Sequence, residues 1–171
     1  MKTTLIVLST LFGLLISSPA QVSTDPNEGS RLTHDAVNGT FSLSWWGQTG
    51  RTYFVVQSDD LFFWTYVPLI EFEEDDVITW GFTSSAPKLF LRLRYTDVPT
   101  TDPFGDDFDG DGMNNWWEVR TQLDPLVAND SNANPDGDDA TNLQESIANT
   151  SPSDPSPVLT LTIPVGATLV P

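Results

Sequence analysis

The run DFDGDGMNNWWE, from Asp107 to Glu118, alternates acidic side chains with small or apolar residues and ends in a glutamate. Ca²⁺ is a hard cation that takes about six to eight oxygen ligands. A loop of this spacing supplies them from side chains at its first, third, fifth, ninth and twelfth places and from the carbonyl at its seventh. Gly112, at the sixth place, permits the positive φ that bends the chain around an ion. The predicted calcium ligands of this first loop are Asp107, Asp109, Asp111, Met113 (through its carbonyl), Asn115 and Glu118.

A second loop with the same spacing begins 27 residues later, at Asn134. Its first side chain is an amide, and Asp139 replaces the glycine of the sixth place. Asp tolerates a left-handed φ better than most residues, although less freely than glycine. The second loop offers three ligand carboxylates against four in the first, so we expect it to be the weaker site. Its predicted ligands are Asn134, Asp136, Asp138, Ala140 (through its carbonyl), Asn142 and Glu145.

Each loop is followed by a short helical stretch and then by a turn that contains proline, at Pro125 and at Pro152. The shared period and phase indicate a stacked array of units. Residues 107–154 resemble the bacterial form of the thrombospondin type 3 repeat, whose units read Asp-x-Asp-Gly-Asp-Gly, then Asn, Glu and Thr/Leu-Asp-Pro. The resemblance implies an extended, calcium-organised spacer or stalk in a secreted or surface protein. Such units also carry an extra acidic residue near the following loop, a place filled here by Asp124, Asp130 and Asp154.

Two neighbouring families fit less well. Helix-loop-helix EF-hands need an entering helix, which the two prolines of segment 98–103 would break. EF-hands also carry an apolar eighth residue, where this chain has Asn114 and Thr141. Dockerins lack entering helices, but their exiting helices are long and their twelfth residue is commonly Asp. Here Pro125 follows Glu118 after only seven residues, so a divergent dockerin remains the second interpretation.

Charge is concentrated in the same half of the chain. The net charge is −17, and 13 of the 24 acidic residues lie between Asp102 and Asp154, where Arg120 is the only base. This density opposes compaction unless a cation neutralises it, and it argues against nucleic acid or anionic membranes as partners. We therefore expect metal-dependent order: chelation should unfold residues 103–155 and leave the preceding module largely intact.

Residues 1–20 have the anatomy of a secretory signal peptide, with Lys2, an apolar core at 5–16, and small residues at Ser18 and Ala20. The apolar core is short for a membrane span, so an uncleaved anchor is the alternative and no membrane insertion is expected after cleavage. The absence of cysteine excludes disulfides. We expect a secreted or cell-surface protein, with calcium as its structural staple.

A β-module is predicted at 39–97, after a flexible lead-in at 21–38. Its alternating apolar segments and turn signals indicate four or five short antiparallel strands, hence a small β-sandwich or half-barrel. Within 89–95 the leucines and Tyr95 share one face, and Arg92 and Arg94 are expected to face water. The module resembles small β-modules that precede such repeats in secreted bacterial proteins. Residues 156–171 are predicted to be an extra strand or a tail.

The predicted fold is mainly β: a small antiparallel sandwich followed by two calcium-loop repeats with short helical turns. Catalysis is not expected, because the chain has no cysteine and its only histidine lies far from any hydrolase pattern. We expect a calcium-binding structural or spacer protein. The alternative is a module that binds an extracellular carbohydrate or protein and is braced by calcium. Trp46 is then the best candidate for an exposed contact, whereas Trp45 is expected in the core and Trp117 between the repeats.

Overall fold

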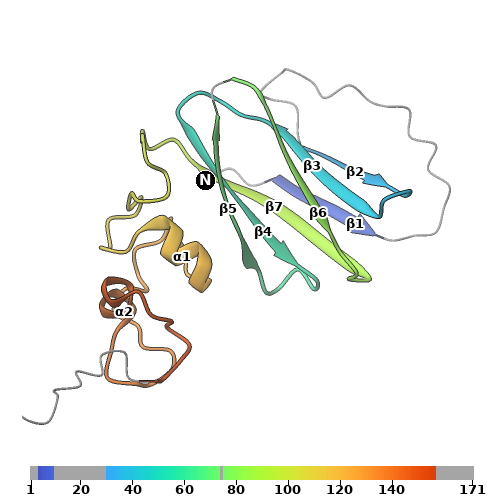
Figure 1. Ribbon diagram of the computed structural model, residues 1–171. Coiled ribbons are helices and arrows are strands. Elements are labelled where there is room, and N and C mark those ends of the chain that lie inside the picture. Colours follow the sequence, from blue (N-terminus) through green and yellow to red (C-terminus); the bar gives the residue numbers. More distant parts are fainter. Residues whose placement is uncertain (1–3, 10–29, 74, 157–171) are drawn as a thin grey trace, which may run out of the picture.

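The computed structural model describes residues 4–9, 30–73 and 75–156. Within them, seven strands form two antiparallel sheets, of order β1-β7-β4-β5 and β2-β3-β6, and two short helices follow (Figure 1). Most of the predicted signal peptide and the predicted C-terminal strand or tail lie outside the described residues. The strands are β1 (Thr4–Ser9), β2 (Arg31–Asp35), β3 (Thr40–Trp46), β4 (Arg51–Ser58), β5 (Thr65–Glu73), β6 (Val77–Thr83) and β7 (Lys88–Thr96).

The two sheets pack against each other around one apolar core. Strand β3 alternates buried and half-buried residues, so that Leu43 and Trp45 enter the core from the second sheet. Strand β7 contributes Leu89, Leu91 and Leu93 from the first sheet. This is the period-2 pattern of strands whose one face is buried. The predicted mainly β fold with a small antiparallel sandwich is confirmed, and so is the core position of Trp45.

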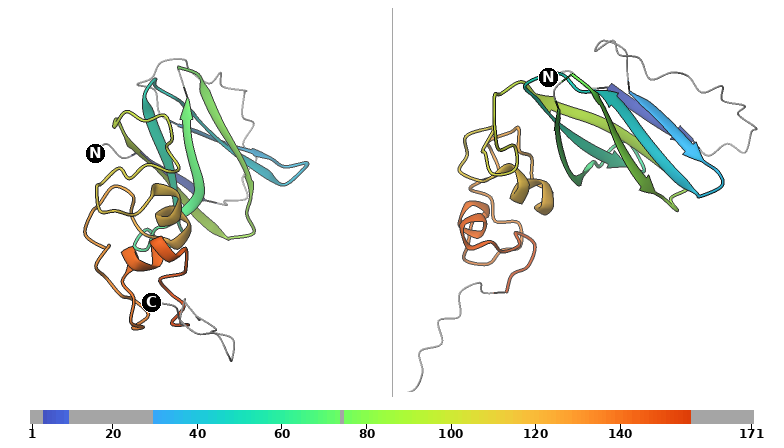
Figure 2. Two further views of the ribbon diagram at one scale, coloured as in Figure 1. Left: turned by 60° about the vertical axis from the view of Figure 1, so that its left-hand side comes forward. Right: turned by 45° about the horizontal axis from the view of Figure 1, so that its top comes forward.

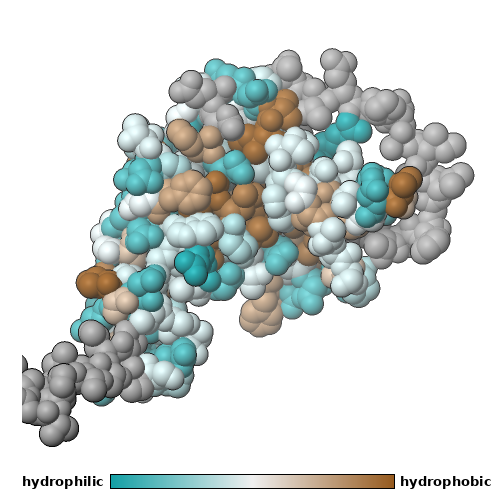
Figure 3. Space-filling model, in the orientation of Figure 1, coloured by the Kyte–Doolittle hydropathy of each residue, from teal (hydrophilic) through white to brown (hydrophobic). Residues whose placement is uncertain are grey.

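Strand β4 is buried on both of its faces. Tyr53 and Val55 face the second sheet, whereas Phe54 and Val56 pack on the other side with Val119 of the first helix. The repeat region (residues 103–155) therefore covers the outer face of the first sheet at β4 and β5. Figures 1 and 2 show α1 beside β5, with α2 farther from the sandwich. On the face shown in Figure 3, hydrophobic surface gathers over the sandwich, and the repeat region is mostly white and teal.

The covered sheet face changes the surroundings of two arginines on β7. Arg94 is only 9 % exposed, and its Nη1 lies 2.6 Å from a carboxylate oxygen of Asp124. The guanidinium of Arg92 lies over the ring of Trp64, 4.0 Å from its centroid. The expectation that both arginines face water is therefore wrong. Asp124 of the repeat region covers Arg94, whereas Arg92 is half-buried against Trp64 of the sandwich itself.

Two strands fall in segments that the sequence did not assign to the sandwich. Strand β2 lies inside the predicted lead-in 21–38 and pairs with β3, where it adds Leu32 to the edge of the core. The continuous run of sandwich strands β2 to β7 therefore begins at Arg31 rather than at Gly39. Strand β1 lies inside the predicted signal peptide and pairs with β7. A chain cleaved after Ala20 would lack β1 and would leave β7 as an edge strand.

Each repeat contains one short helix, α1 (Asn115–Thr121) or α2 (Asn142–Ala148). Asn114 caps α1 by accepting a hydrogen bond from the Trp117 N–H, and Thr141 caps α2 by accepting one from the Gln144 N–H. The polar eighth residues of the loops thus satisfy helix N–H groups, which explains why they are not apolar. In the described part of the chain, no helix is both long enough and apolar enough to cross a membrane.

Core packing predicts a large difference between the two faces of β3. Leu43 is fully buried, so Leu43→Ala should lower the free energy of unfolding by about 2–5 kcal/mol. Ser42→Ala, on the other face of the same strand, should change it by no more than about 0.5 kcal/mol. Urea denaturation of both variants measures the difference, and equal effects would contradict the assigned core.

Candidate metal centre

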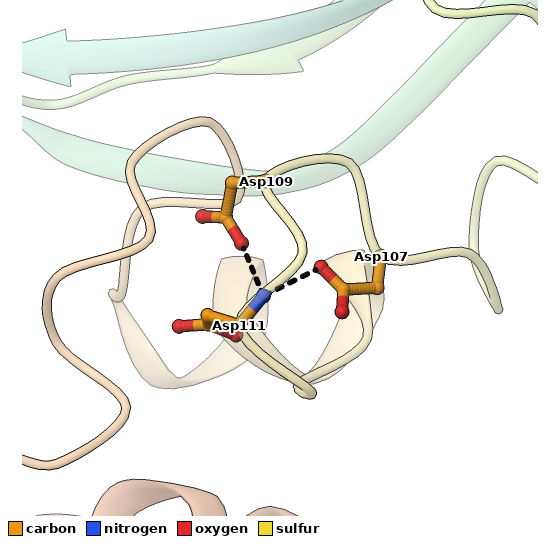
Figure 4. A group of neighbouring side chains, drawn as sticks. All are labelled: Asp107, Asp109 and Asp111. Atoms are coloured by element: carbon orange, nitrogen blue, oxygen red, sulfur yellow. Dashed lines mark hydrogen bonds between the residues drawn. The ribbon is translucent and has the colours of Figure 1, made fainter.

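The first loop is folded around its own carboxylates. Asp107 accepts hydrogen bonds from the backbone N–H groups of Gly110, at 2.6 Å, and Gly112, at 2.8 Å. Asp109 accepts one from the Asp111 N–H at 3.2 Å, and Figure 4 shows these three acidic side chains around that amide. Each carboxylate that makes such a bond with one oxygen keeps lone pairs for another partner.

Two features of the structure require a glycine at the sixth place of the first loop. Gly112 has a φ of 96°, in the left-handed region that disfavours side chains. A Cβ atom built on it would also lie 3.0 Å from a methyl carbon of Leu143, which belongs to the second repeat. The bend of the first loop and the contact between the repeats therefore both depend on this glycine.

Three groups of acidic residues each bring ligand atoms within 4.8 Å of one another. Two of the groups share Asp111, so the first loop and Asp130 form one continuous site. Asp130 follows α1 in the chain and was recognised in the sequence only as an extra acidic residue, not as a ligand. The groups are Asp107 with Asp109 and Asp111, Asp111 with Glu118 and Asp130, and Asp136 with Asp138 and Glu145.

The terminal glutamate of each loop is fully buried. Glu118 and Glu145 are both 0 % exposed, and neither side chain makes a hydrogen bond within the part of the chain that the structure describes. One buried oxygen each of Asp111 and Asp130 is also without a hydrogen-bond partner among the described residues. A buried carboxylate that lacks a partner is costly, so these oxygens require a proton or a cation. Oxygen donors converging on one point fit a hard cation.

The electrostatics of the first site follow from this crowding. Burial, and then the neighbouring carboxylates led by Asp109 and Asp111, raise the pKa of Glu118 to about 9. Burial and the charge of Asp111 raise the pKa of Asp109 to about 6. Burial and the charge of Asp136 also raise the pKa of Glu145. The ionised forms of Glu118, Asp109 and Glu145 are therefore disfavoured unless positive charge is supplied.

The two loops belong to one structural repeat of 27 residues. The side chain of Asn115 donates to the carbonyl of Pro103, and that of Asn142 donates to the carbonyl of Asp130, both at 2.9 Å. The backbone N–H of each Asn also donates to the carbonyl nine residues earlier, again at 2.9 Å. The repeated unit therefore begins before the loop. Pro103 and Asp130 hold equivalent places, 27 residues apart, and the next equivalent place is Pro157. That place therefore offers the second loop no carboxylate like that of Asp130.

The predicted ninth-place ligands are used differently in the two loops. The Oδ1 of Asn115 accepts a hydrogen bond from the Phe108 N–H at 3.0 Å. In the second loop the corresponding residue is Pro135, which has no N–H. The buried Oδ1 of Asn142 accordingly makes no hydrogen bond to the described residues. The side-chain oxygen of Asn115 thus stabilises the backbone of its own loop, whereas the side-chain oxygen of Asn142 is available to a bound ion.

The second loop departs from the first at the positions noted in the sequence. The Oδ1 of Asn134 accepts a hydrogen bond from the Gly137 N–H at 2.8 Å, so this amide takes the backbone role of Asp107. Asp139 does not adopt a positive φ, unlike Gly112. The second loop is therefore bent differently at its sixth place. Met113 and Ala140 remain ligands by prediction only, through their carbonyls.

The repeats contact each other through a tryptophan. Trp117 is 6 % exposed, and its indole N–H donates to the carbonyl of Thr150 at 3.1 Å. The expected packing of Trp117 between the repeats is confirmed. Trp116 is half-buried, packs edge-on against Phe104, and borders the apolar cluster that joins α1 to the first sheet.

Comparisons with protein-family models, with curated proteins and with solved structures found no match to this chain. The site is therefore interpreted from its own residues.

The raised pKa of Glu118 predicts how the metal-free protein responds to pH. Its folded value of about 9 lies above the ordinary value of about 4.3, so the protonated folded form is favoured. This contribution to stability is complete below about pH 4.3 and is lost as the pH rises towards 9. In EDTA, the midpoint temperature of thermal unfolding should decrease as the pH is raised from about 5 to about 9.

Glu118→Gln is the matched control, because its amide does not titrate, and its midpoint should depend less on pH. Thermal unfolding followed by tryptophan fluorescence measures both proteins. A wild-type midpoint that rises across this range would contradict the assigned burial.

Proposed function

We propose that this protein is a calcium-binding structural protein of the extracellular space, in which two acidic repeats bind Ca²⁺ and extend from a β-sandwich. One observation carries the proposal. Glu118 is fully buried with both carboxylate oxygens unpaired among the described residues, and it lies in a group with Asp111 and Asp130. A cation bound at this point would satisfy both oxygens of the ionised glutamate and offset its repulsion by the neighbouring carboxylates.

The donor set favours calcium over other metals. All members of the three acidic groups are carboxylates, the chain has no cysteine, and its only histidine, His34, lies on β2 in the sandwich. Hard oxygen donors select Mg²⁺, Ca²⁺ or Mn²⁺ over zinc or copper. A bound Ca²⁺ would supply positive charge to carboxylates that otherwise repel one another. Mg²⁺ fits less well, because it keeps several waters and is held by one or two carboxylates.

The first site would be held by Asp107, Asp109, Asp111, Glu118 and Asp130, and the second by Asp136, Asp138 and Glu145, with the Oδ1 of Asn142 available. The first site thus has five carboxylates and the second has three. The first is therefore expected to bind calcium more tightly, as the loop sequences alone also predict. The resemblance to the thrombospondin type 3 repeat and the signal-like residues 1–20 support an exported protein, where calcium is abundant. The sequence offers no arrangement typical of a catalytic site, so the proposed role is structural.

Calcium titration should show that Glu118 contributes more to calcium affinity than Glu145. Glu118→Gln removes a carboxylate from the fuller site and should weaken the tighter binding event by at least about tenfold, or about 1.4 kcal/mol. Glu145→Gln should affect only the weaker event. Asp59→Asn, at an exposed residue of the sandwich, is the control and should change neither.

Calorimetric titration of the full chain with CaCl₂ separates the two events and gives their stoichiometry. The proposal is rejected if millimolar CaCl₂ produces no binding heat, and the ranking is reversed if Glu145→Gln costs more than Glu118→Gln.

A second candidate function, recognition of an extracellular protein, is favoured by the loop between β4 and β5. Phe62 and Phe63 are 84 % and 80 % exposed at this loop. Their backbone N–H groups donate to Oδ1 of Asp60, at 2.8 and 2.9 Å, and Leu61 holds a φ of 71°. A fixed loop that presents two aromatic side chains to solvent is typical of a binding contact.

The tryptophans give less support to a carbohydrate platform. Trp45 is buried, Trp64 is covered by the guanidinium of Arg92, and Trp80 stacks on Phe82 at a centroid distance of 4.3 Å. Trp46 is half-buried rather than exposed. The exposed phenylalanines have no polar group for a sugar hydroxyl, so an apolar pocket on a protein is the better match.

The double variant Phe62→Ser/Phe63→Ser tests this candidate against Trp46→Ala. We expect the double variant to keep its unfolding free energy within about 0.5 kcal/mol, because both side chains are exposed. It should lose binding to extracellular proteins of the cell that produces it, measured by biolayer interferometry, whereas Trp46→Ala should retain that binding. Binding to a glycan array that only Trp46→Ala abolishes would support the carbohydrate interpretation instead.

A further inference from the structure

We infer that the first repeat is an integral layer of the β-sandwich, and that its metal site stabilises the first sheet through the contacts of Asp130, Asp124 and Arg94. This inference rests on the proposed calcium function and deepens it. It also reverses the expectation that chelation leaves the β-module intact. A stalk that merely follows a module would share few buried contacts with it, whereas here the contacts are apolar, polar and ionic.

The apolar contacts connect helix α1 to the outer face of the first sheet. Val119, fully buried on α1, clusters with Phe54, Val56, Tyr66 and Ile70 of β4 and β5. Phe108 of the first loop meets Phe54 edge-on at a centroid distance of 6.2 Å. The sheet face therefore needs the repeat as its cover, because the same residues would otherwise lie in water.

The ionic contact is made by Arg94 and Asp124. The Nη1 of Arg94 donates to Oδ2 of Asp124 at 2.6 Å and also to the hydroxyl of Tyr66. That hydroxyl donates to Oδ1 of Asp124 at 2.9 Å. Arg94 is only 9 % exposed, so this ion pair is shielded from water, and the pair would be lost if the repeat moved away from the sheet.

Gln122 adds a contact that mimics strand pairing. Its Oε1 accepts from the Tyr66 N–H at 2.7 Å, and its Nε2 donates to the Tyr66 carbonyl at 3.1 Å. Strand β5 is the last strand of the first sheet, so these backbone groups face the open edge. One side-chain amide thus supplies the donor and acceptor that a neighbouring strand would have offered.

The metal site and the sheet contacts share the same short segment of chain. Glu118, whose oxygens belong to the site, directly precedes Val119, which packs on the sheet. Asp130 has one buried oxygen in the site, and its Oδ2 accepts from the Asp124 N–H at 3.3 Å. Asp124 in turn holds Arg94. The residues that would hold the ion are therefore linked to the sheet by one peptide bond and by two hydrogen-bonded contacts.

Without the ion, repulsion among the carboxylates of the first site would weaken both links to the sheet, the one through Val119 and the one through Asp124. If α1 and the segment after it lose their positions, the apolar face of the first sheet is uncovered and Arg94 is left without Asp124. Among the described residues, the cluster that contains Val119 includes no residue of the second sheet, and Leu43 and Trp45 of β3 belong to the inner core. The inference therefore predicts a graded response: the first sheet should depend on calcium more than the second.

Hydrogen exchange of the full chain, with CaCl₂ and with EDTA, tests this directly. Calcium should slow exchange by at least about tenfold in peptides covering β4 and β7, as well as in residues 103–155. Peptides of β3 should respond less and serve as the internal reference. Calorimetry on the same samples reports calcium binding independently.

Arg94→Gln should keep calcium binding but reduce the calcium-dependent protection of β7, and that of β4 to a smaller extent, because the packing of Val119 on β4 remains. Arg51→Gln is the matched control, because Arg51 also leaves the first sheet to pair with an aspartate, Asp97 at 2.6 Å, away from the repeats. It should leave the calcium effect unchanged. Should Arg94→Gln fail to fold, Gln122→Ala removes the contact with the edge of β5, together with a hydrogen bond to the Val119 carbonyl, and should reduce the protection of β5.

The outcomes separate the two proposals. Calcium binding with protection confined to residues 103–155 would overturn this inference and leave the proposed function standing. An equal loss of protection in Arg51→Gln and Arg94→Gln would also overturn it. An absence of calcium binding would overturn the proposed function, and the inference with it.

Discussion

The buried carboxylate of Glu118 is the constraint on which the rest of this structure depends. The Glu118 side chain, on α1, has no exposed surface, and both of its oxygens lack hydrogen bonds among the described residues. Asp111 and Asp130 share its site. Hydrophobic packing cannot compensate for such a group, since a desolvated charge costs more than burying one apolar side chain returns. Under the proposed function, a cation at this point would let α1 keep its position, and α1 covers the first sheet through Val119.

The repeat region and the sandwich are therefore better described as one body than as a module with a stalk. The 27-residue register of hydrogen bonds builds each unit from a loop, a capped helix of seven residues and a turn. Such a helix is too short to be stable alone. Trp117 and Gly112 connect the first unit to the second, and Arg94 connects it to β7. These contacts form a continuous path from the loops through α1 to the first sheet.

Much of this could be predicted from the sequence, because it depends on local patterns. Alternating apolar residues predicted the sandwich strands and the core position of Trp45, and the acidic spacing predicted both groups of loop carboxylates. The errors share one cause, which is contact between segments distant in the chain. Strand β2 carries only one core residue, Leu32, and reads as polar loop until β3 is beside it. Arg94 alternates like a surface residue, and only the repeat region, folded over it, makes it buried.

The central claim is that Glu118 and Asp130 converge on a bound calcium ion. A crystal structure of the full chain grown with CaCl₂, with anomalous data collected to identify the ion, tests it most directly. The account predicts an ion in the first loop contacted by both oxygens of Glu118 and by one oxygen of Asp130. The same fold with no ion at millimolar calcium, and with Glu118 still buried and unpaired, would contradict it.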